Sequence, residues 1–154
     1  MSKYDNISNY VHLPLQAGSN KILKRMNRTY SKEYFTALAL KIREILPNVG
    51  ISTDIIVGFP GESEGDFNET LNVMNEVKFD SAFNFKYSSR RGTKASEYDD
   101  QIPENIKQDR LQRVINLQKI HTLENNKKLV GRFEKVIVEK KSKMAKKQWA
   151  GRID

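Results

Sequence analysis

Hydrophobic and polar positions follow two different periods along the chain, and these predict strands and helices in succession. Apolar and β-branched residues run together or alternate over residues 10–15, 51–57 and 81–87, which is typical of strands. Between these segments, residues 21–27, the stretch after Ser31 and residues 64–77 show helical spacing. Strands separated by helices of this length predict a parallel sheet with right-handed crossovers.

Residues with capping preferences mark where two of these helices begin. Ser31 stands before an apolar stripe that Pro47 ends, and Glu33 lies in the first turn. The stripe consists of Tyr34, Phe35, Leu38, Ile42, Ile45 and Leu46. Ser63, followed three residues later by Asp66, predicts an N-cap for the helix over residues 64–77.

A longer helix and a β segment follow. Pro103 is placed to begin a helix that runs to about residue 129, and Gly131 is placed to end it. Its apolar residues repeat every three positions, at Leu111, Val114, Leu117, Ile120 and Leu123. Such a stripe drifts around a 3.6-residue helix, so we expect this helix to wrap around the domain. Beyond Gly131 the pattern predicts two strands, over about 133–138 and 148–153.

Composition narrows the class of protein. The 154 residues fit one domain, or one domain and a fragment of another, and 38% of them are hydrophobic. No apolar run reaches the roughly 20 residues that span a bilayer, and we expect a soluble, cytoplasmic protein without a membrane partner. The chain has no cysteine, which excludes disulfides, thiol catalysis and cysteine-ligated clusters held by its own residues. His12 and His121 are far apart in sequence and predict no metal site.

The positive charge is concentrated at one end of the chain. Residues 1–126 hold 17 Lys/Arg and 16 Asp/Glu, a net charge of +1, whereas residues 127–154 hold 10 Lys/Arg and 3 Asp/Glu, a net charge of +7. A basic segment attached to a neutral domain indicates a polyanion partner, most simply nucleic acid. A solvated tail is the alternative that charge alone leaves open.

Four loops that follow strands or join elements are the candidate functional segments: residues 12–19, 27–30, 56–62 and 88–93. The third lies in ISTDIIVGFPGE, where a β-branched run stops at Gly58 and a helix opens soon after. Ligands of parallel α/β proteins bind at this carboxyl end of the strands. Each loop taken alone also fits an ordinary turn or a surface ion pair. No Walker A, GxGxxG, catalytic triad or zincin motif is present.

Taken in order, these loops resemble one family. HLPLQAGSNKILKRMNRTYSKEYF, ISTDIIVGFPGESEGDF, FDSAFNFKYSSRRGT and LQRVINLQ are similar to the second half of the radical S-adenosylmethionine (SAM) domain of MiaB-type tRNA methylthiotransferases. The tail VIVEKKSKMAKKQWAGRID resembles the opening of their TRAM domain. The resemblance implies an α/β fold: half of a (βα) partial TIM barrel with parallel strands over residues 1–130, then the beginning of a small β domain over residues 131–154.

The resemblance also implies an activity. Enzymes of this family methylthiolate N6-isopentenyladenosine next to the anticodon of tRNA, using S-adenosyl-L-methionine and two 4Fe-4S clusters. The cluster-binding cysteines belong to sequence upstream of Met1, so we expect a fragment of the enzyme, with no metal ligands and no catalysis of its own. The related enzyme that acts on threonylcarbamoyladenosine shares these features. The sequence also fits a stand-alone α/β RNA-binding module with a basic β arm, or a plain α/β domain with a solubilising tail.

Carried over by position, the resemblance assigns residues to each ligand. The S-adenosylmethionine site would include Gln16, Ser19, Ile56 and Gly58. Arg28 and Asp54 would lie near the cofactor or the substrate adenosine. The residues expected at the tRNA anticodon stem-loop are Arg90, Arg91, Lys140, Lys141, Lys143, Lys146, Lys147 and Arg152. A half-barrel has unpaired strand edges, so we also expect the chain to self-associate through one or to pair its own tail there.

Overall fold

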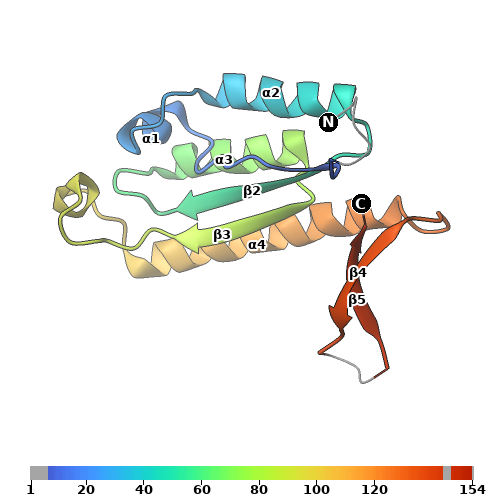
Figure 1. The fold of residues 1–154 in the computed structure, drawn as a ribbon. Helices are drawn as coiled ribbons and strands as arrows, with labels where there is room; N and C mark the ends of the chain where they lie inside the picture. Colours follow the sequence, from blue (N-terminus) through green and yellow to red (C-terminus); the bar gives the residue numbers. More distant parts are fainter. Residues whose placement is uncertain (1–6, 144–146, 154) are drawn as a thin grey trace.

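The computed structural model describes residues 7–143 and 147–153, which form an α/β unit and a separate hairpin (Figure 1). Three parallel strands make the sheet in the order β1-β2-β3: β1 (Tyr10–His12), β2 (Gly50–Val57) and β3 (Ser81–Lys86). The connecting helices are α1 (Asn20–Arg25), α2 (Lys32–Ile45) and α3 (Glu64–Val77). A 3-10 turn, η1 (Lys94–Glu97), and the long helix α4 (Glu104–Lys127) follow β3. The predicted parallel sheet with helical crossovers is therefore confirmed.

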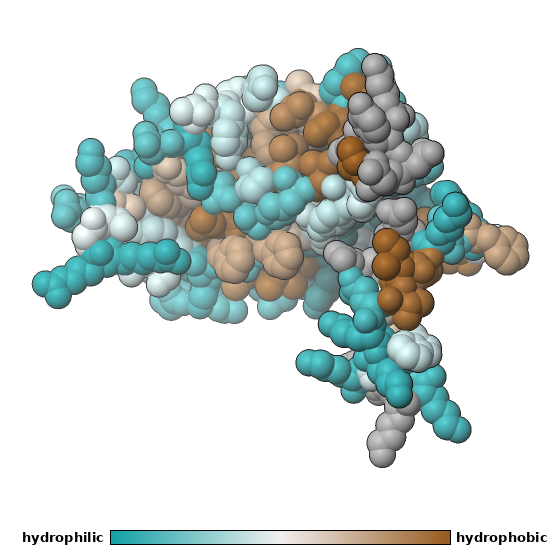
Figure 2. Space-filling view, viewed as in Figure 1, coloured by the Kyte–Doolittle hydropathy of each residue, from teal (hydrophilic) through white to brown (hydrophobic). Residues whose placement is uncertain are grey.

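The helices cover one face of the sheet and leave the other face open. Alternate residues of β2, among them Ile55 and Val57, are fully buried beneath the helices. On the opposite face, Phe83 and Phe85 of β3 remain 56% and 52% exposed. Figure 2, which looks toward this open face, shows hydrophobic side chains lying among hydrophilic ones. Among the described residues, side chains of the sheet are thus accessible to a ligand on this face.

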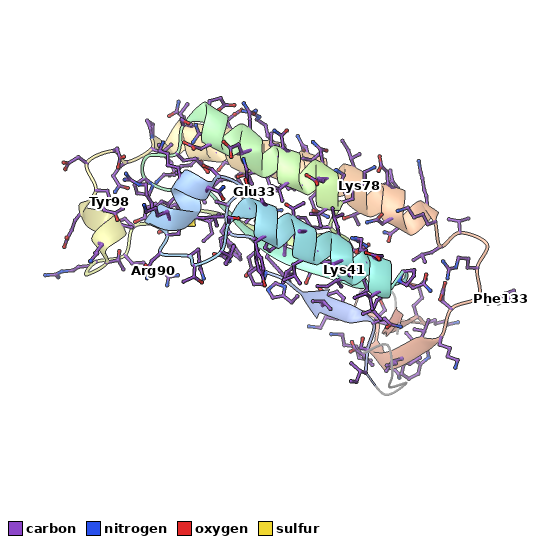
Figure 3. The ribbon with its side chains drawn as sticks, turned by 90° about the horizontal axis from the view of Figure 1, so that it is seen from above. Glu33, Lys41, Lys78, Arg90, Tyr98 and Phe133 are labelled. Atoms are coloured by element: carbon purple, nitrogen blue, oxygen red, sulfur yellow. The ribbon has the colours of Figure 1, made fainter. Side chains whose placement is uncertain are left out.

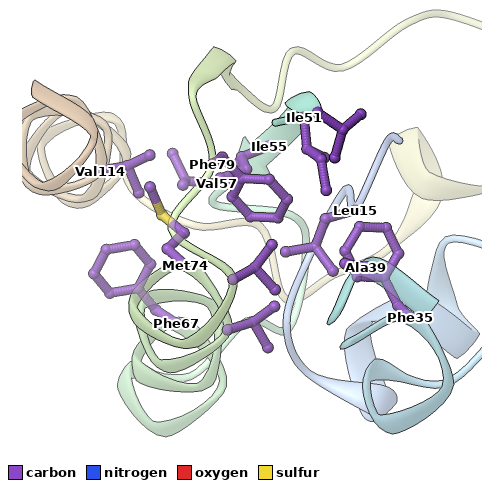
Figure 4. Packing of buried hydrophobic residues seen from close by; sticks show 13 residues of the cluster. Leu15, Phe35, Ala39, Ile51, Ile55, Val57, Phe67, Met74, Phe79 and Val114 are labelled. Carbon is purple, nitrogen blue, oxygen red and sulfur yellow. The ribbon is translucent and has the colours of Figure 1, made fainter. Parts of the chain in front are cut away.

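The core lies between the sheet and the helix layer. Ile51 and Ile55 of β2 pack with Phe67 and Met74 of α3 and with Val114 of α4, all of them essentially inaccessible to water (Figure 4). Burying a side chain of this size contributes about 1.5–3 kcal/mol to folding. The core therefore fixes the position of β2, whose carboxyl end carries the glycine-rich loop.

Local sequence signals place the ends of two helices correctly. Ser63 accepts a hydrogen bond from the Asp66 amide at 3.1 Å, and the Asp66 carboxylate accepts one from the Ser63 amide at 2.9 Å, a complete capping box. Ser31 caps α2 by accepting from the Tyr34 amide at 3.2 Å. Both predicted N-caps are confirmed.

The apolar stripe of α4 drifts around the helix, as its period of three predicts, and is not the whole of its buried face. The buried residues are Lys107, Arg110, Val114, Gln118 and His121. Their spacing of three or four residues follows the true helical period, whereas the period-three stripe turns away from the sheet and leaves Ile120 and Leu123 54% and 56% exposed. In the α2 stripe, Tyr34 and Ile45 are likewise exposed, at 64% and 55%.

The basic tail forms its own two-stranded sheet. Strands β4 (Val136–Lys141) and β5 (Trp149–Ile153) pair antiparallel and do not join the three-stranded sheet. The expectation that the tail pairs with an edge of the parallel sheet is therefore wrong for these strands. The hairpin projects beyond the end of α4, away from α1 and η1 (Figure 1). Among the described residues, no helix has the length and apolar character needed to cross a membrane.

Candidate functional site: a cationic cavity at the strand ends

A cavity of about 1510 Å³ opens at the carboxyl ends of β2 and β3. Its walls come from α1 and the turn after it, from the ends of β2 and β3, and from the segment that leads into η1. Gln16, Arg28, Ile56 and Arg90, all predicted as site residues, line it together. Figure 3 shows Arg90 and Tyr98 at this end of the molecule, far from Phe133. The cavity thus lies where a parallel α/β sheet binds its ligands.

The floor of the cavity is apolar and has one amide. Ile56 pairs with Phe85 across β2 and β3, and both side chains line the cavity. The backbone of Gln16 lies in the left-handed region, at φ 68°. Two backbone hydrogen bonds to β2 hold it there: the Gln16 N–H donates to the Asp54 carbonyl oxygen, and the Gln16 carbonyl oxygen accepts from the Ile56 N–H, each at 2.8 Å. Its side-chain oxygen accepts from Arg28 Nη2 at 3.2 Å.

Aromatic side chains form one side of the cavity. Phe59 packs edge-on against Tyr87 with ring centroids 5.0 Å apart, and against Tyr98 at 6.5 Å. The Arg25 guanidinium lies 4.5 Å from the Tyr98 ring. Aromatic faces beside cations are suited to an adenine base, because both stacking and cation–π contacts are available.

Gly58 serves the scaffold of the cavity rather than its surface. Its φ is 72°, and a Cβ there would lie 2.4 Å from Lys107 Cγ of α4. Its N–H donates to Glu62 Oε2 at 2.6 Å. Gly58 does not line the cavity; its assignment to the cofactor stays a prediction, and its evident role is to let α4 pack against the loop.

A buried ion pair holds this glycine-rich loop. Arg110 of α4 donates from Nη1 to Glu62 Oε2 at 2.8 Å and to the Glu62 carbonyl at 2.9 Å, and both side chains are at least 95% buried. Burial raises the pKa of Glu62, and the Gly58 N–H and the Arg110 guanidinium offset only part of that effect. The loop is thus locked to a residue far along the chain.

Ser19 has a comparable structural role. It is 2% exposed, and its Oγ donates to Asp66 Oδ1 at 2.7 Å, while Lys21 Nζ donates to Asp66 Oδ2 at 2.9 Å. Burial alone would raise the pKa of Asp66, but the hydrogen bonds from Ser63, Lys21 and Ser19 outweigh it and hold that pKa well below its usual range. Ser19 does not line the cavity, so its contact with a cofactor stays a prediction.

Asp54 lies outside the cavity, on the open face of the sheet. His12 Nε2 is 3.4 Å from Asp54 Oδ2, and His12 Nδ1 is 2.8 Å from the hydroxyl of Ser52. Ser52 is fully buried, which makes it unsuitable as a nucleophile. The cluster gives the open face a polar site next to Phe83, whose ring is 6.1 Å from that of His12.

The residues predicted for RNA fall into two groups. Arg90 lines the cavity, whereas Arg91 is exposed beside it and does not. The others belong to the hairpin, where Lys140, Lys141, Lys143 and Lys147 are exposed and Lys141 Nζ lies 5.9 Å from the Trp149 ring. Arg152 pairs with Ile137 in the strand register, and Lys146 lies outside the described residues.

Sequence reasoning missed the groups that α4 contributes. Lys107 packs against Gly58, donates to the Tyr87 carbonyl at 3.3 Å and lies 5.3 Å from its ring. Arg110 was not anticipated either. Both are distant in sequence from the loops that they hold, so no local motif could identify them; the only available signal was their helical spacing with Val114.

Comparison with known proteins shows which class of protein this chain resembles. The sequence model described as the radical SAM superfamily matches residues 1–74. The fold is similar to that of coproporphyrinogen III oxidase from Escherichia coli, a radical SAM enzyme, with a TM-score of 0.62 and 25% identity over 73% of this chain and 27% of that one. The chain therefore has a radical SAM-type α/β fold, as the loops predicted.

The particular resemblance is to one kind of radical SAM enzyme. The chain is 50% identical over 150 residues to the tRNA-2-methylthio-N(6)-dimethylallyladenosine synthase of Clostridium tetani, and 49% identical over 152 residues to that of Carboxydothermus hydrogenoformans. These alignments cover 97% and 99% of this chain but 33% and 34% of the relatives, so it spans about a third of their length. The resemblance to MiaB-type tRNA methylthiotransferases is confirmed.

Proposed function

We propose that this chain is a part of a radical SAM tRNA methylthiotransferase whose substrate is N6-dimethylallyladenosine, also called N6-isopentenyladenosine, beside the anticodon. The observation that carries the proposal is the 49–50% identity, over nearly the whole chain, to proteins that bear this activity in their names. The cavity supports it, because it lies at the strand ends and has apolar, aromatic and cationic lining that suits adenosine and phosphate.

The residues of the cavity fit S-adenosylmethionine. Ile56 offers an apolar contact, the Gln16 amide offers hydrogen bonds, and Arg28, oriented by Gln16, suits a carboxylate. When bound, this cofactor supplies the adenosyl radical chemistry of the family. The 4Fe-4S clusters of these enzymes need thiolate ligands, and because the chain has no cysteine, none of its residues is assigned to them.

The hairpin is proposed to contact the tRNA. It carries exposed lysines together with Trp149, which is 66% exposed and has Lys141 Nζ 5.9 Å from its ring, so phosphate contact and base stacking are both available on the hairpin. We interpret residues 131–154 as the beginning of a TRAM domain and residues 1–130 as part of the radical SAM domain. A tRNA substrate also implies that the protein acts in the cytoplasm.

Cofactor binding tests the first half of this proposal. Titration of the chain with S-adenosylmethionine in a calorimeter should give saturable binding that Ile56→Ala and Gln16→Ala each weaken several-fold. Leu40→Ala, on the outer surface of α2, is the matched control and should leave the affinity unchanged. Equal affinity in all four proteins would contradict the assignment of the cavity.

RNA binding tests the second half. Fluorescence anisotropy with an anticodon stem-loop should show salt-sensitive binding by the whole chain, and deletion of residues 131–154 should weaken it. If the deletion leaves affinity and salt dependence unchanged, the role assigned to the hairpin is wrong.

A further inference from the structure

The cations that line the cavity divide into neutralised and free groups. Seven lining residues are lysine or arginine, and within the described part of the chain the lining contains no carboxylate. Three of the seven are neutralised from outside it: Lys21 by Asp66 at 2.9 Å, Arg25 by Asp100 at 2.7 Å, and Lys86 by Glu104. Ion pairs of this kind hold the walls together and leave those three cations with little charge to offer a ligand.

The other four cations are available to a ligand. Lys24, Arg28, Arg90 and Lys94 are all exposed, and within residues 7–143 and 147–153 none of them has a carboxylate within ion-pair distance. Lys24 comes from α1, whereas Lys94 begins η1, so two segments distant in sequence bring like charges to the rim of one cavity. Figure 1 shows α1 and the yellow turn η1 at the same end of the sheet, toward which the arrows of β2 and β3 point. Like charges held together in this way create a positive potential that attracts an anion.

We propose that Lys24 and Lys94 bind the backbone phosphates on either side of the nucleotide that enters the cavity. This inference rests on the proposed function and deepens it, since it gives the RNA a second contact surface at the cavity rim, separate from the hairpin. It names two residues that the sequence pattern had not assigned. Arg28, whose Nη2 donates to the Gln16 side-chain oxygen at 3.2 Å, is assigned above to the cofactor carboxylate and is not one of this pair.

The size and charge of the cavity favour RNA as the occupant of the rim. Its volume of about 1510 Å³ exceeds the roughly 300–1,000 Å³ of a site for one small ligand, which leaves room for a nucleotide beside a cofactor. The sulfonium of S-adenosylmethionine is itself a cation and gains nothing from an excess of free lysines. Phe85 and Tyr98 line the same cavity and offer stacking faces to an unstacked base.

The test is the salt dependence of stem-loop binding by the whole chain. The double variant Lys24→Ala/Lys94→Ala removes two charges at the rim and leaves the hairpin intact. Neutralising one single-strand phosphate contributes about 0.7 to the slope of log K against log salt, so the slope should become shallower by about 1.4. The matched control is Lys41→Ala/Lys119→Ala, two exposed lysines outside the cavity, which should keep the parent slope.

Each result decides between the proposals. A shallower slope in the rim variant alone supports the inference. An unchanged slope with normal binding overturns it and leaves the proposed function standing, whereas no RNA binding by the parent chain overturns both. Titration with S-adenosylmethionine tests whether these lysines bind the cofactor carboxylate instead of RNA phosphates. If the affinity for S-adenosylmethionine falls in the rim variant while the RNA slope is unchanged, the lysines belong to the cofactor site and the inference is overturned.

Discussion

Individual polar residues of α4 hold the loops that build the cavity. Arg110 binds the side chain and the carbonyl of Glu62, and the stem of Lys107 occupies the space beside Gly58. An arginine buried in this way is stable only while its partner carboxylate remains. The geometry of the glycine-rich loop therefore depends on residues outside it.

Removing the guanidinium should destabilise the protein strongly. Arg110→Ala leaves Glu62 buried without a cation, and breaking a buried pair in this way costs about 3–5 kcal/mol. Urea unfolding followed by circular dichroism measures the change. Arg113→Ala is the matched control: its 2.7 Å ion pair with Glu64 is more exposed and should cost about 1 kcal/mol or less. Similar losses in the two variants would refute the structural role of Arg110.

A second prediction at this scale concerns close packing at Gly18. A Cβ on Gly18 would lie 2.4 Å from the Thr70 Cα and 2.6 Å from the Glu69 carbonyl, both of them backbone atoms of α3. Gly18→Ala should therefore cost about 1–3 kcal/mol, as overpacking does. Gly65→Ala, in the first turn of α3 with its nearest neighbour atom at 3.7 Å, should be neutral or stabilising by up to about 1 kcal/mol. Thermal unfolding measures both changes: the midpoint of Gly18→Ala should lie below that of Gly65→Ala, and the reverse order would contradict the prediction.

At the scale of elements, the strands and capped helices could be predicted and the orientation of α4 could not. Residues 51–57 and 64–77 coincide closely with β2 and α3, because alternation and the Ser63 capping box are local signals. The buried face of α4 is made of polar residues whose partners lie far along the chain. Gln118, for example, donates to the Phe79 carbonyl at 2.8 Å. A pattern of apolar residues alone cannot identify such a face.

The same buried polar face predicts a dependence of stability on pH. Burial lowers the pKa of His121 below its ordinary value of 6.5; nearby Glu124 raises this pKa and Lys78 lowers it. Below about pH 6.5 the unfolded chain takes up a proton that the folded chain takes up only at lower pH, so stability is lost as the pH falls.

Substitution isolates this contribution. His121→Gln should reduce the fall in unfolding free energy between about pH 7.5 and 5, while Ile120→Gln, on the exposed side of α4, should keep the full fall. The measurement is the urea midpoint at each pH. An identical pH profile for His121→Gln and the parent chain would contradict the assignment.

At the scale of the whole molecule, the structure has two basic surfaces at opposite ends. One is the rim of the cavity, and the other is the hairpin beyond α4 (Figures 1 and 3). Charge counting predicted the hairpin because its lysines are close together in sequence. The free cations of the cavity could be predicted only in part, at Arg28 and Arg90, because Lys24 and Lys94 come together only through folding.

The exposed strand edges carry a prediction about association. β1 and β3 are the outer strands of the parallel sheet, and open edges of this kind pair with other chains. Multi-angle light scattering should show a mass that rises above the 17.8 kDa of one chain as concentration increases. Deletion of residues 131–154 should preserve the rise if the sheet edges cause it. A constant monomer mass over the whole concentration range would refute the prediction.

Nucleoside analysis of tRNA gives the most direct test of the proposed activity. A chimera carries this chain in place of the matching segment of the Clostridium tetani relative, to which it is 50% identical. It is produced in a host that lacks methylthiolation, beside the intact relative as control. Mass spectrometry of the tRNA should detect 2-methylthio-N6-dimethylallyladenosine. A folded chimera that yields none, or that modifies threonylcarbamoyladenosine instead, while the intact relative is active, would contradict the account.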